Sequence, residues 1–355
     1  LQLSLRGWRR LESLELRFYD FAHGHFQLSV MRSGAAPAAE PKPKPRSPLQ
    51  RNEVLEVGVF GVERTKEYAG AKAPAGRTFV VVDLRARSLF SAEADATAFD
   101  PKAKAGSKTR IGTVADWKES RRYTQLVADG EIAFAPLSSS GLAEEPRFLP
   151  DVLTGGSLAF LAPEKTVSLE LRCDFPNAKS SLDGRVFRPQ GITIPVDGKR
   201  PKLEARKAIL AIQDDVFDVA VTELTTPGEL AGQAPAEGQR RVALDVTVSN
   251  TGKKGEFFQP LEQLKLVLAA GTLIAVDPAA LEGVRAPLPL IWIPPGERRS
   301  FQAVYRVPSS EAKLRLAYAG VSLEKTLNLP AMDTAPAPPP PATTVAKPVP
   351  DPEKP

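Results

Sequence analysis

One pattern of residues occurs twice in this sequence, at 57–83 and again at 219–245. Both stretches open with a short alternating apolar segment, pass through Ala-Gly and Ala-Pro-Ala steps, and end in an apolar run closed by Asp83 or Asp245. The start and the closing aspartate are both displaced by 162 positions (219 − 57 and 245 − 83). Such a repeat predicts one structural module built twice, and it names no reaction.

The apolar runs of both copies have a period of two, which is typical of a half-buried antiparallel strand. The apolar positions are Val80, Val82, Leu84 and Ala86 in the first copy and Val242, Leu244, Val246 and Val248 in the second. We expect the carboxylates of Asp83 and Asp245 to lie on the opposite, solvated face. Many short strands separated by turns predict a sandwich or a barrel.

A second correspondence links Pro163 and the strand pattern at 169–175 to Pro295 and the pattern at 301–307. Its displacement is 132 (295 − 163), so the first copy is expected to contain about 30 extra residues within 90–150. Helix patterns are short and lie at 260–264 and 277–281, where proline follows a possible N-cap. We therefore predict an all-β chain with a first module at 52–200 and a second at 210–330.

The segments outside the two modules differ from them in composition. Residues 1–32 alternate on both sides of a His-Gly turn and predict a β-hairpin, which we interpret as the end of an upstream domain rather than a part of the next one. Residues 33–51 are rich in proline, alanine and lysine and predict an extended linker. Residues 331–355 predict a disordered proline-rich tail.

Composition excludes several functional classes. The 355 residues include 47 Lys and Arg and 42 Asp and Glu, and this net charge of +5 is spread along the chain, a pattern that disfavours nucleic-acid binding. No apolar run approaches the length of a membrane span. The single cysteine, Cys173, excludes an intrachain disulfide, so the modules must be stable through packing alone.

The closing residues of the second copy point to a family. The segment 293–297, Ile-Pro-Pro-Gly-Glu, precedes a strand that ends in Val307-Pro308, and 242–252 is a valine-rich strand that runs into an asparagine turn. This arrangement resembles small bacterial extracytoplasmic immunoglobulin-like domains of the secreted, mycobacterial-antigen-like type. The resemblance implies two tandem immunoglobulin-like antiparallel β-sandwiches, a periplasmic, cell-surface or secreted location, and no shared catalytic residues.

The extra residues of the first copy contain the best candidates for partner binding. Aromatic residues beside arginine are common anchors of interfaces, and the loops between sandwich strands often carry recognition. We expect that these residues either contact a protein or an envelope glycan, or form an extra edge hairpin in which the tryptophan is buried. The candidates are Trp117, Arg121, Arg122 and Tyr123.

Other reactive residue types favour structural roles. His23 and His25, with Asp20, could form a two-histidine, one-carboxylate metal site, but their aromatic neighbours favour a packed hairpin. Cys173 has no histidine in its module to activate it. The aspartates at 100 and 214–215 lack the repeated spacing of a calcium loop.

We therefore expect no enzyme activity, no cofactor and no metal. The expected role is a non-catalytic structural or protein-interaction module of a bacterial envelope or secreted multidomain protein. The alternative is an accessory carbohydrate- or peptide-binding module that uses the insertion loops of the first sandwich.

Overall fold

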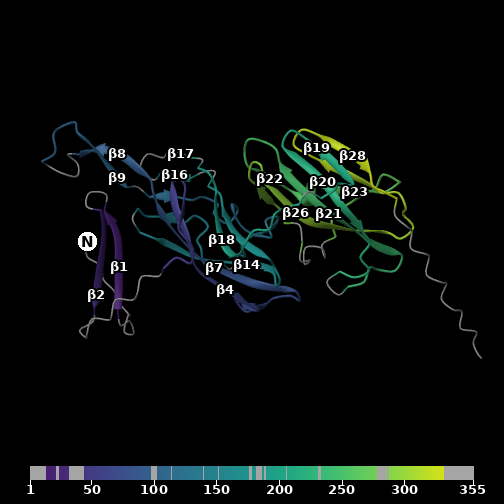
Figure 1. The fold of residues 1–355 in the computed structure, drawn as a ribbon, viewed down its shortest axis with the longest axis horizontal. Helices are drawn as coiled ribbons and strands as arrows, with labels where there is room; N and C mark the ends of the chain where they lie inside the picture. The colour runs from purple at the N-terminus through teal and green to yellow at the C-terminus, as the bar shows by residue number, and fades with distance from the viewer. Residues whose placement is uncertain are drawn as a thin grey trace, which may run out of the picture.

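The computed structural model is almost entirely β-structure (Figure 1). It describes residues 13–20, 24–31, 44–96, 102–112, 114–138, 140–150, 152–175, 178–180, 186–187, 189–204, 206–230, 233–277, 285 and 288–331. For 13–20, 24–31, 92–95, 111 and 178–180 it describes the backbone alone. Within this part the single α-helix is α1 (Pro260–Gln263), in agreement with the helix expected at 260–264. Most of the helix expected at 277–281 lies outside the described residues.

The expected hairpin is present at the start of the chain. Strand β1 (Ser13–Asp20) pairs antiparallel with β2 (Gly24–Met31), from Ser13 opposite Met31 to Asp20 opposite Gly24. The turn with His23 lies outside the described residues, as does the tail from 332 onward. The end of the expected linker is part of the fold, because β3 (Gln50–Arg51) pairs with the next strand.

Residues 44–198, the first β unit, contain two four-stranded antiparallel sheets. The strands of one sheet, in spatial order, are β14 (Thr154–Pro163), β7 (Arg77–Ser88), β4 (Leu55–Thr65) and β3. The strands of the other are β12 (Ile132–Phe134), β11 (Thr124–Ala128), β15 (Ser168–Cys173) and β18 (Ile192–Gly198). Side chains from both sheets enclose one continuous apolar core.

Residues 208–331, the second β unit, repeat this strand order around a second core; residues 199–207 connect the two units. One sheet consists of β26 (Arg298–Pro308), β21 (Gln239–Asn250), β20 (Phe217–Thr225) and β19 (Leu210–Gln213). The other consists of β24 (Leu273–Ile274), β23 (Leu264–Val267), β27 (Arg315–Ala319) and β28 (Glu324–Asn328). A short pair, β22 (Glu256–Phe258) and β25 (Ile291–Ile293), completes the unit.

The sequence repeat is preserved in the pairing of these strands. Val57 lies opposite Ala86 in the first unit, and Val219 lies opposite Val248 in the second, each 162 positions later. The pairs β4–β7 and β20–β21 also shift register at the same place, between Val59 and Gly61 in one and between Val221 and Glu223 in the other. Asp83 and Asp245 therefore lie beside an equivalent bulge. A bulge bends a strand and re-aims its side chains, so its repetition gives 57–83 and 219–245 the same local strand geometry.

The second correspondence, between Pro163 and Pro295, is wrong. Pro163 ends β14, whereas Pro295 precedes β26, and these two strands occupy the same place in their sheets. Equivalent positions are 145 residues apart, since Ser157 lies opposite Asp83 and Gln302 lies opposite Asp245 (302 − 157). Strand β15 corresponds instead to β27. An alternating apolar pattern followed by proline identifies a strand but not its partner, which explains the error.

The extra residues of the first unit lie between its β7 and β11. This interval runs from 89 to 123 in the first unit and from 251 to 263, between β21 and β23, in the second. It contains the pair β8 (Ser91–Asp95) and β9 (Lys108–Gly112) and the strand β10 (Ala115–Asp116). Strand β10 joins a small sheet with β13 (Arg147–Phe148), β16 (Ala178–Ser180) and β17 (Val186–Phe187).

The two closing aspartates differ in environment. Asp83 is one-third exposed and pairs with Arg85 at 2.9 Å, whereas the side chain of Asp245 is 9% exposed. Arg285 and Gln302 donate to the two oxygens of Asp245 at 2.5 and 3.0 Å. The expectation of a solvated Asp245 is therefore wrong, because an arginine from another segment covers the outer face of its strand.

No helix in the described part is long and apolar enough to cross a membrane.

Candidate functional site

Trp117 lies in the core of the first unit and not at its surface. Its side chain is 1% exposed and packs against Phe175 and Phe148, with ring centroids 4.5 and 6.3 Å away. The indole Nε1 donates to the carbonyl of Asp174 at 3.1 Å. Of the two expectations for this insertion, the structure agrees with a buried tryptophan, because Trp117 directly follows strand β10 and belongs to the core of the first unit.

Arg121 holds a neighbouring loop in place. Its guanidinium donates to three backbone carbonyls, those of Ser138, Ser140 and Leu142, at 2.9–3.0 Å. These bonds occupy both terminal nitrogens. Arg121 therefore fixes the segment that covers the outer edge of β14, where Leu142 N–H donates to Ser157.

Arg122 and Tyr123 contact the second unit. The Tyr123 ring lies 5.4 Å from Phe257 and 5.0 Å from Trp292, the latter edge-to-face, and the Arg122 guanidinium lies 4.7 Å from the centre of the Phe257 ring. Burial and the nearby Glu119 raise the pKa of Tyr123, so its hydroxyl stays protonated at neutral pH. Two of the four candidates thus take part in a junction within this chain.

Glu131 joins the units on the other side of this junction. Its carbonyl accepts the backbone N–H of Ser300 at 3.0 Å, and its carboxylate accepts the Ser300 hydroxyl at 2.9 Å. The same carboxylate, 8% exposed, pairs with Arg298 and with Arg206 of the connecting segment. Ala133, two residues later, packs into the core of the second unit. The turn before β12 is therefore docked on the edge of β26.

Between these two contacts, four charged side chains alternate in sign across the junction. Arg172 binds both oxygens of Asp174 at 3.0 Å and lies 3.1 Å from Glu297, which in turn pairs with Arg299 at 2.9 Å. Arg299 is 1% exposed. Cys173, between Arg172 and Asp174, points the other way, into the core, and is fully buried.

Burial and charge pairing act in opposite directions on this network. Desolvation raises the pKa of Asp174 despite its bond to Arg172. Desolvation also acts to raise the pKa of Glu297, but Arg299 and Arg172 outweigh it and hold that pKa below its usual value. Desolvation lowers the pKa of Arg299. Buried charges are tolerated where they are paired, so the network is stable only with the two units together.

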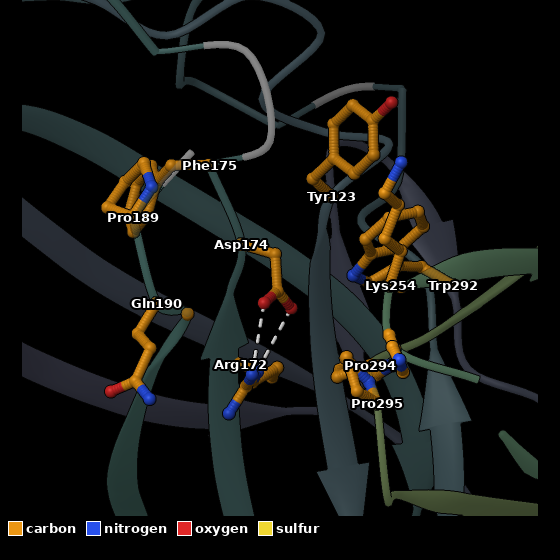
Figure 2. Close-up of a pocket in the computed structure, with 13 residues that line it drawn as sticks. Tyr123, Arg172, Asp174, Phe175, Pro189, Gln190, Lys254, Trp292, Pro294 and Pro295 are labelled. Atoms are coloured by element: carbon orange, nitrogen blue, oxygen red, sulfur yellow. Dashed lines mark hydrogen bonds and ion pairs between the residues drawn. The ribbon is translucent and has the colours of Figure 1, made fainter. Parts of the chain in front are cut away.

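A half-open cleft of about 700 Å³ lies beside this network, between the units. Figure 2 shows the bonded pair Arg172 and Asp174 in the middle, with Tyr123 and Trp292 on one side and Gln190 on the other. The full lining is Tyr123, Arg172, Asp174, Phe175, Pro189, Gln190, Gly191, Lys253, Lys254, Gly255, Trp292, Pro294 and Pro295. The first six residues and Gly191 come from the first unit, and the remainder from the second.

Two glycines make this packing possible. A Cβ at Gly191 would lie 1.9 Å from the Asp174 carboxylate, and a Cβ at Gly255 would lie 2.2 Å from the Trp292 ring. Real side chains do not approach this closely, so neither position accepts even alanine without a shift of the neighbouring side chain.

Cys173 and Asp214, two residues considered for chemistry, both have structural surroundings. Within the described residues, no group of three or more histidine, cysteine, aspartate and glutamate side chains could hold a metal ion. Burial raises the pKa of the Cys173 thiol far above its ordinary value, so this thiol is not a nucleophile at neutral pH. Asp214 has a structural role: its carboxylate accepts the N–H groups of Val216 and Phe217 and the hydroxyl of Tyr318.

Some predicted sites fall outside this description. Asp100 and His23 are not among the described residues, and only the backbone of His25 is described.

The sequence reasoning also missed the residues that build the junction. In the sequence, Arg172, Asp174 and Glu297 look like the solvated positions of alternating strands, and Trp292 looks like part of an ordinary apolar run, so only the pairing of the units identifies them.

No protein-family model matches the sequence, and no curated protein matches it. Among solved structures, a conserved hypothetical protein from Bacillus anthracis is similar over 33% of this chain and 92% of that protein, with 15% identity and a TM-score of 0.28. An uncharacterized β-sandwich protein from Clostridium difficile is similar over 36% of this chain and 98% of that protein, with 11% identity and a TM-score of 0.24. A protein from Bacillus subtilis described as a "putative lipoprotein" is similar over 37% of this chain and 39% of that protein, with 16% identity and a TM-score of 0.29.

Proposed function

We propose that this chain is a non-catalytic structural module of a bacterial envelope or secreted multidomain protein, in which two immunoglobulin-like sandwiches form one rigid body. The strand order supports the immunoglobulin-like assignment. With β4, β7 and β14 as strands A, B and E, and β11, β15 and β18 as C, F and G, the first unit follows the order of that fold. The second unit does the same with its equivalent strands.

The observation that carries the proposal is the docking of Glu131 on the edge of β26. One residue of the first unit makes a backbone hydrogen bond, a hydroxyl hydrogen bond and an ion pair with Ser300 and Arg298 of the second. The connecting segment is held at two points, since Arg298 also donates to the carbonyl of Glu204 and Arg200 donates to that of Gly130. Flexibly tethered domains would not bury such contacts.

An extracytoplasmic location is part of the same proposal. It is supported by the resemblance of 242–252 and 293–308 to extracytoplasmic domains and by the proline-rich segments on both sides of the two units. Fractionation of the host cells with an antibody against the chain tests it. Recovery of the native protein in the periplasm, at the surface or in the medium is expected, and recovery in the cytosol would overturn it.

The alternative, a carbohydrate- or peptide-binding module that uses the insertion loops, has fewer side chains available. Trp117 is buried, the terminal nitrogens of Arg121 are bonded to carbonyls, and Tyr123 faces the second unit. The structural role is therefore the better-supported proposal.

Limited trypsin digestion tests the rigid body. The connecting segment contains cleavage sites at Lys199, Lys202, Arg206 and Lys207. In the native chain we expect slow cleavage there, and in Glu131→Ala we expect cleavage at least ten times faster, with each unit still folded. Glu164→Ala, which removes an exposed pair with Lys66, is the control and should match the native rate. Cleavage of the native chain at these sites as fast as in urea would refute the proposal.

A further inference from the structure

One hydrogen-bond donor in the lining of the junction cleft has no partner among the described residues. Trp292 is 9% exposed, and its indole Nε1 is buried without a hydrogen bond within the described residues. Leaving such a group unsatisfied costs about 1–3 kcal/mol, and native structures rarely do so without a reason. The hydroxyl of Tyr123, which also lines the cleft, stays protonated and able to donate.

The charge of the cleft is positive. Lys253 and Lys254 are exposed at its rim, and neither has an ion pair among the described residues. The one carboxylate in the lining, that of Asp174, is bound through both oxygens by Arg172. The two ammonium groups are therefore not neutralised by the cleft itself, and the donors outnumber the acceptors. A ligand with carboxylate groups complements this arrangement.

Part of the lining is apolar. Phe175 and Pro189 form one side, and Pro294 and Pro295 form the other (Figure 2). The volume of about 700 Å³ lies within the usual range of ligand sites, about 300–1,000 Å³. A suitable ligand thus presents acidic groups next to apolar side chains.

The aromatic rings distinguish between two kinds of ligand. A sugar stacks on an open aromatic face, but the rings of Tyr123 and Trp292 pack on each other and on Phe257 and are 7% and 9% exposed. An extended peptide needs no such face, because its carboxylates reach the lysines while its apolar side chains contact the prolines. The geometry points to a peptide.

We infer that the junction cleft binds an acidic, apolar-containing peptide segment of a partner protein. The carboxylates of the peptide pair with Lys253 and Lys254 and accept from the indole N–H of Trp292, and its apolar side chains lie against Pro294 and Pro295. This inference rests on the proposed function, because the cleft exists only while the two units are docked, and it adds a partner to the structural role.

Fluorescence polarisation with the full chain tests the inference. The probe is a library of fluorescein-labelled nonapeptides in which Glu or Asp alternates with Pro, Leu or Val, and its counterpart has Gln and Asn in place of the acids. We expect saturable binding of the acidic library, at least tenfold weaker binding of the neutral one, and at least a tenfold loss in the double variant Lys253→Glu, Lys254→Glu. Both lysines are exposed, so this variant should fold normally.

The matched control is Lys313→Glu, Lys325→Glu, which makes the same change of charge at exposed positions outside the cleft lining. It should bind within twofold of the native chain. The inference is overturned by an absence of binding to the acidic library, by an equal loss in the control, or by binding of a uronic-acid oligosaccharide in place of the peptides. Trypsin protection of 199–207, measured in the same samples, distinguishes failure of the peptide site from failure of the proposed rigid body. A protected chain that binds nothing refutes the peptide site alone, and an unprotected chain refutes the rigid body.

Discussion

The two β units share their strand order. They differ most in the interval that connects β7 to β11 in the first unit and β21 to β23 in the second. In the first unit this interval, 89–123, is long and contributes Trp117 to the core. In the second unit it is short, 251–263, and contributes Lys253 and Lys254 to the cleft. The two intervals nevertheless meet, because the ring centroid of Tyr123, at the end of one, lies 5.4 Å from that of Phe257 in the other. Equivalent segments of a repeated module have thus become the two sides of its internal junction.

The same strand frame carries an interval of very different length in the two units. The bulged strand pair is the same in both units, since it is fixed by core packing and register. The interval is free to vary in length because it connects the two sheets at one end of the sandwich. Each interval contributes an aromatic side chain to its own core, Trp117 in the first unit and Phe258 in the second. Each also lines the shared cleft, through Tyr123 in the first unit and Lys253 and Lys254 in the second.

The largest effect is expected from Trp117→Ala. Removal of a large buried aromatic side chain costs about 3–5 kcal/mol in the free energy of unfolding. Because Trp117 lies in the core of the first unit, the loss should appear in the unfolding of that unit, followed by near-ultraviolet circular dichroism in urea. Lys118→Ala, the exposed neighbour, should change stability by less than about 0.5 kcal/mol. A loss below about 1 kcal/mol for Trp117→Ala would contradict a core role for the insertion.

The next effect is expected from Glu297→Ala. This change leaves Arg299, which is 1% exposed, without its carboxylate, and breaking a buried pair from one side costs about 3–5 kcal/mol. Removal of both charges, in Glu297→Leu with Arg299→Leu, should restore most of the stability, because a buried pair replaced by apolar side chains is often neutral. If the double variant is as unstable as the single one in chemical denaturation, the unpaired charge of Arg299 is not the cause of the instability.

Acid should weaken this pairing in a defined direction. The pKa of Glu297 is held below its usual value in the folded chain, so its contribution is present above the unfolded pKa and is lost as the pH falls through the folded one. Asp174, whose pKa is raised, acts in the opposite direction. The difference in unfolding free energy between the native chain and Glu297→Gln should therefore shrink between about pH 7 and about pH 3. A constant difference over this range would exclude the effect.

The smallest effect is expected from Arg122→Ala. The guanidinium lies over the Phe257 ring but is 47% exposed, which limits its contribution to about 0.5–1 kcal/mol. Glu119→Ala removes the ion pair with Arg122 and leaves the ring contact. If Glu119→Ala destabilises as much as Arg122→Ala in thermal unfolding, the ion pair and not the aromatic contact carries the effect.

The sequence predicted the parts of the fold that depend on local pattern. The alternation at 80–86 and 242–248 identified strands β7 and β21, and the equal displacement of Asp83 and Asp245 identified the repeated strand pair. The bulge in that pair was not predicted. The insertion was located approximately, but its length was overestimated because the pattern of β15 was matched to that of β26.

The candidate site was beyond local pattern. Arg172 and Asp174 alternate with buried positions of β15, so the sequence assigns them to solvent, and only the second unit covers them. The same holds for Glu131, which lies in a turn and is buried by Arg298 and Ser300. Charged residues that face another unit cannot be distinguished from surface residues until both units are placed.

The fixed arrangement of the two units can be measured directly as a distance between two spin labels. Cys173 is fully buried and resists labelling, so nitroxides can be attached at Glu67→Cys in the first unit and Lys325→Cys in the second, both exposed. Double electron–electron resonance should give one narrow distance distribution in the native chain and a broad one in Glu131→Ala. A broad distribution in the native chain would contradict the central claim that the junction holds the two sandwiches as one body.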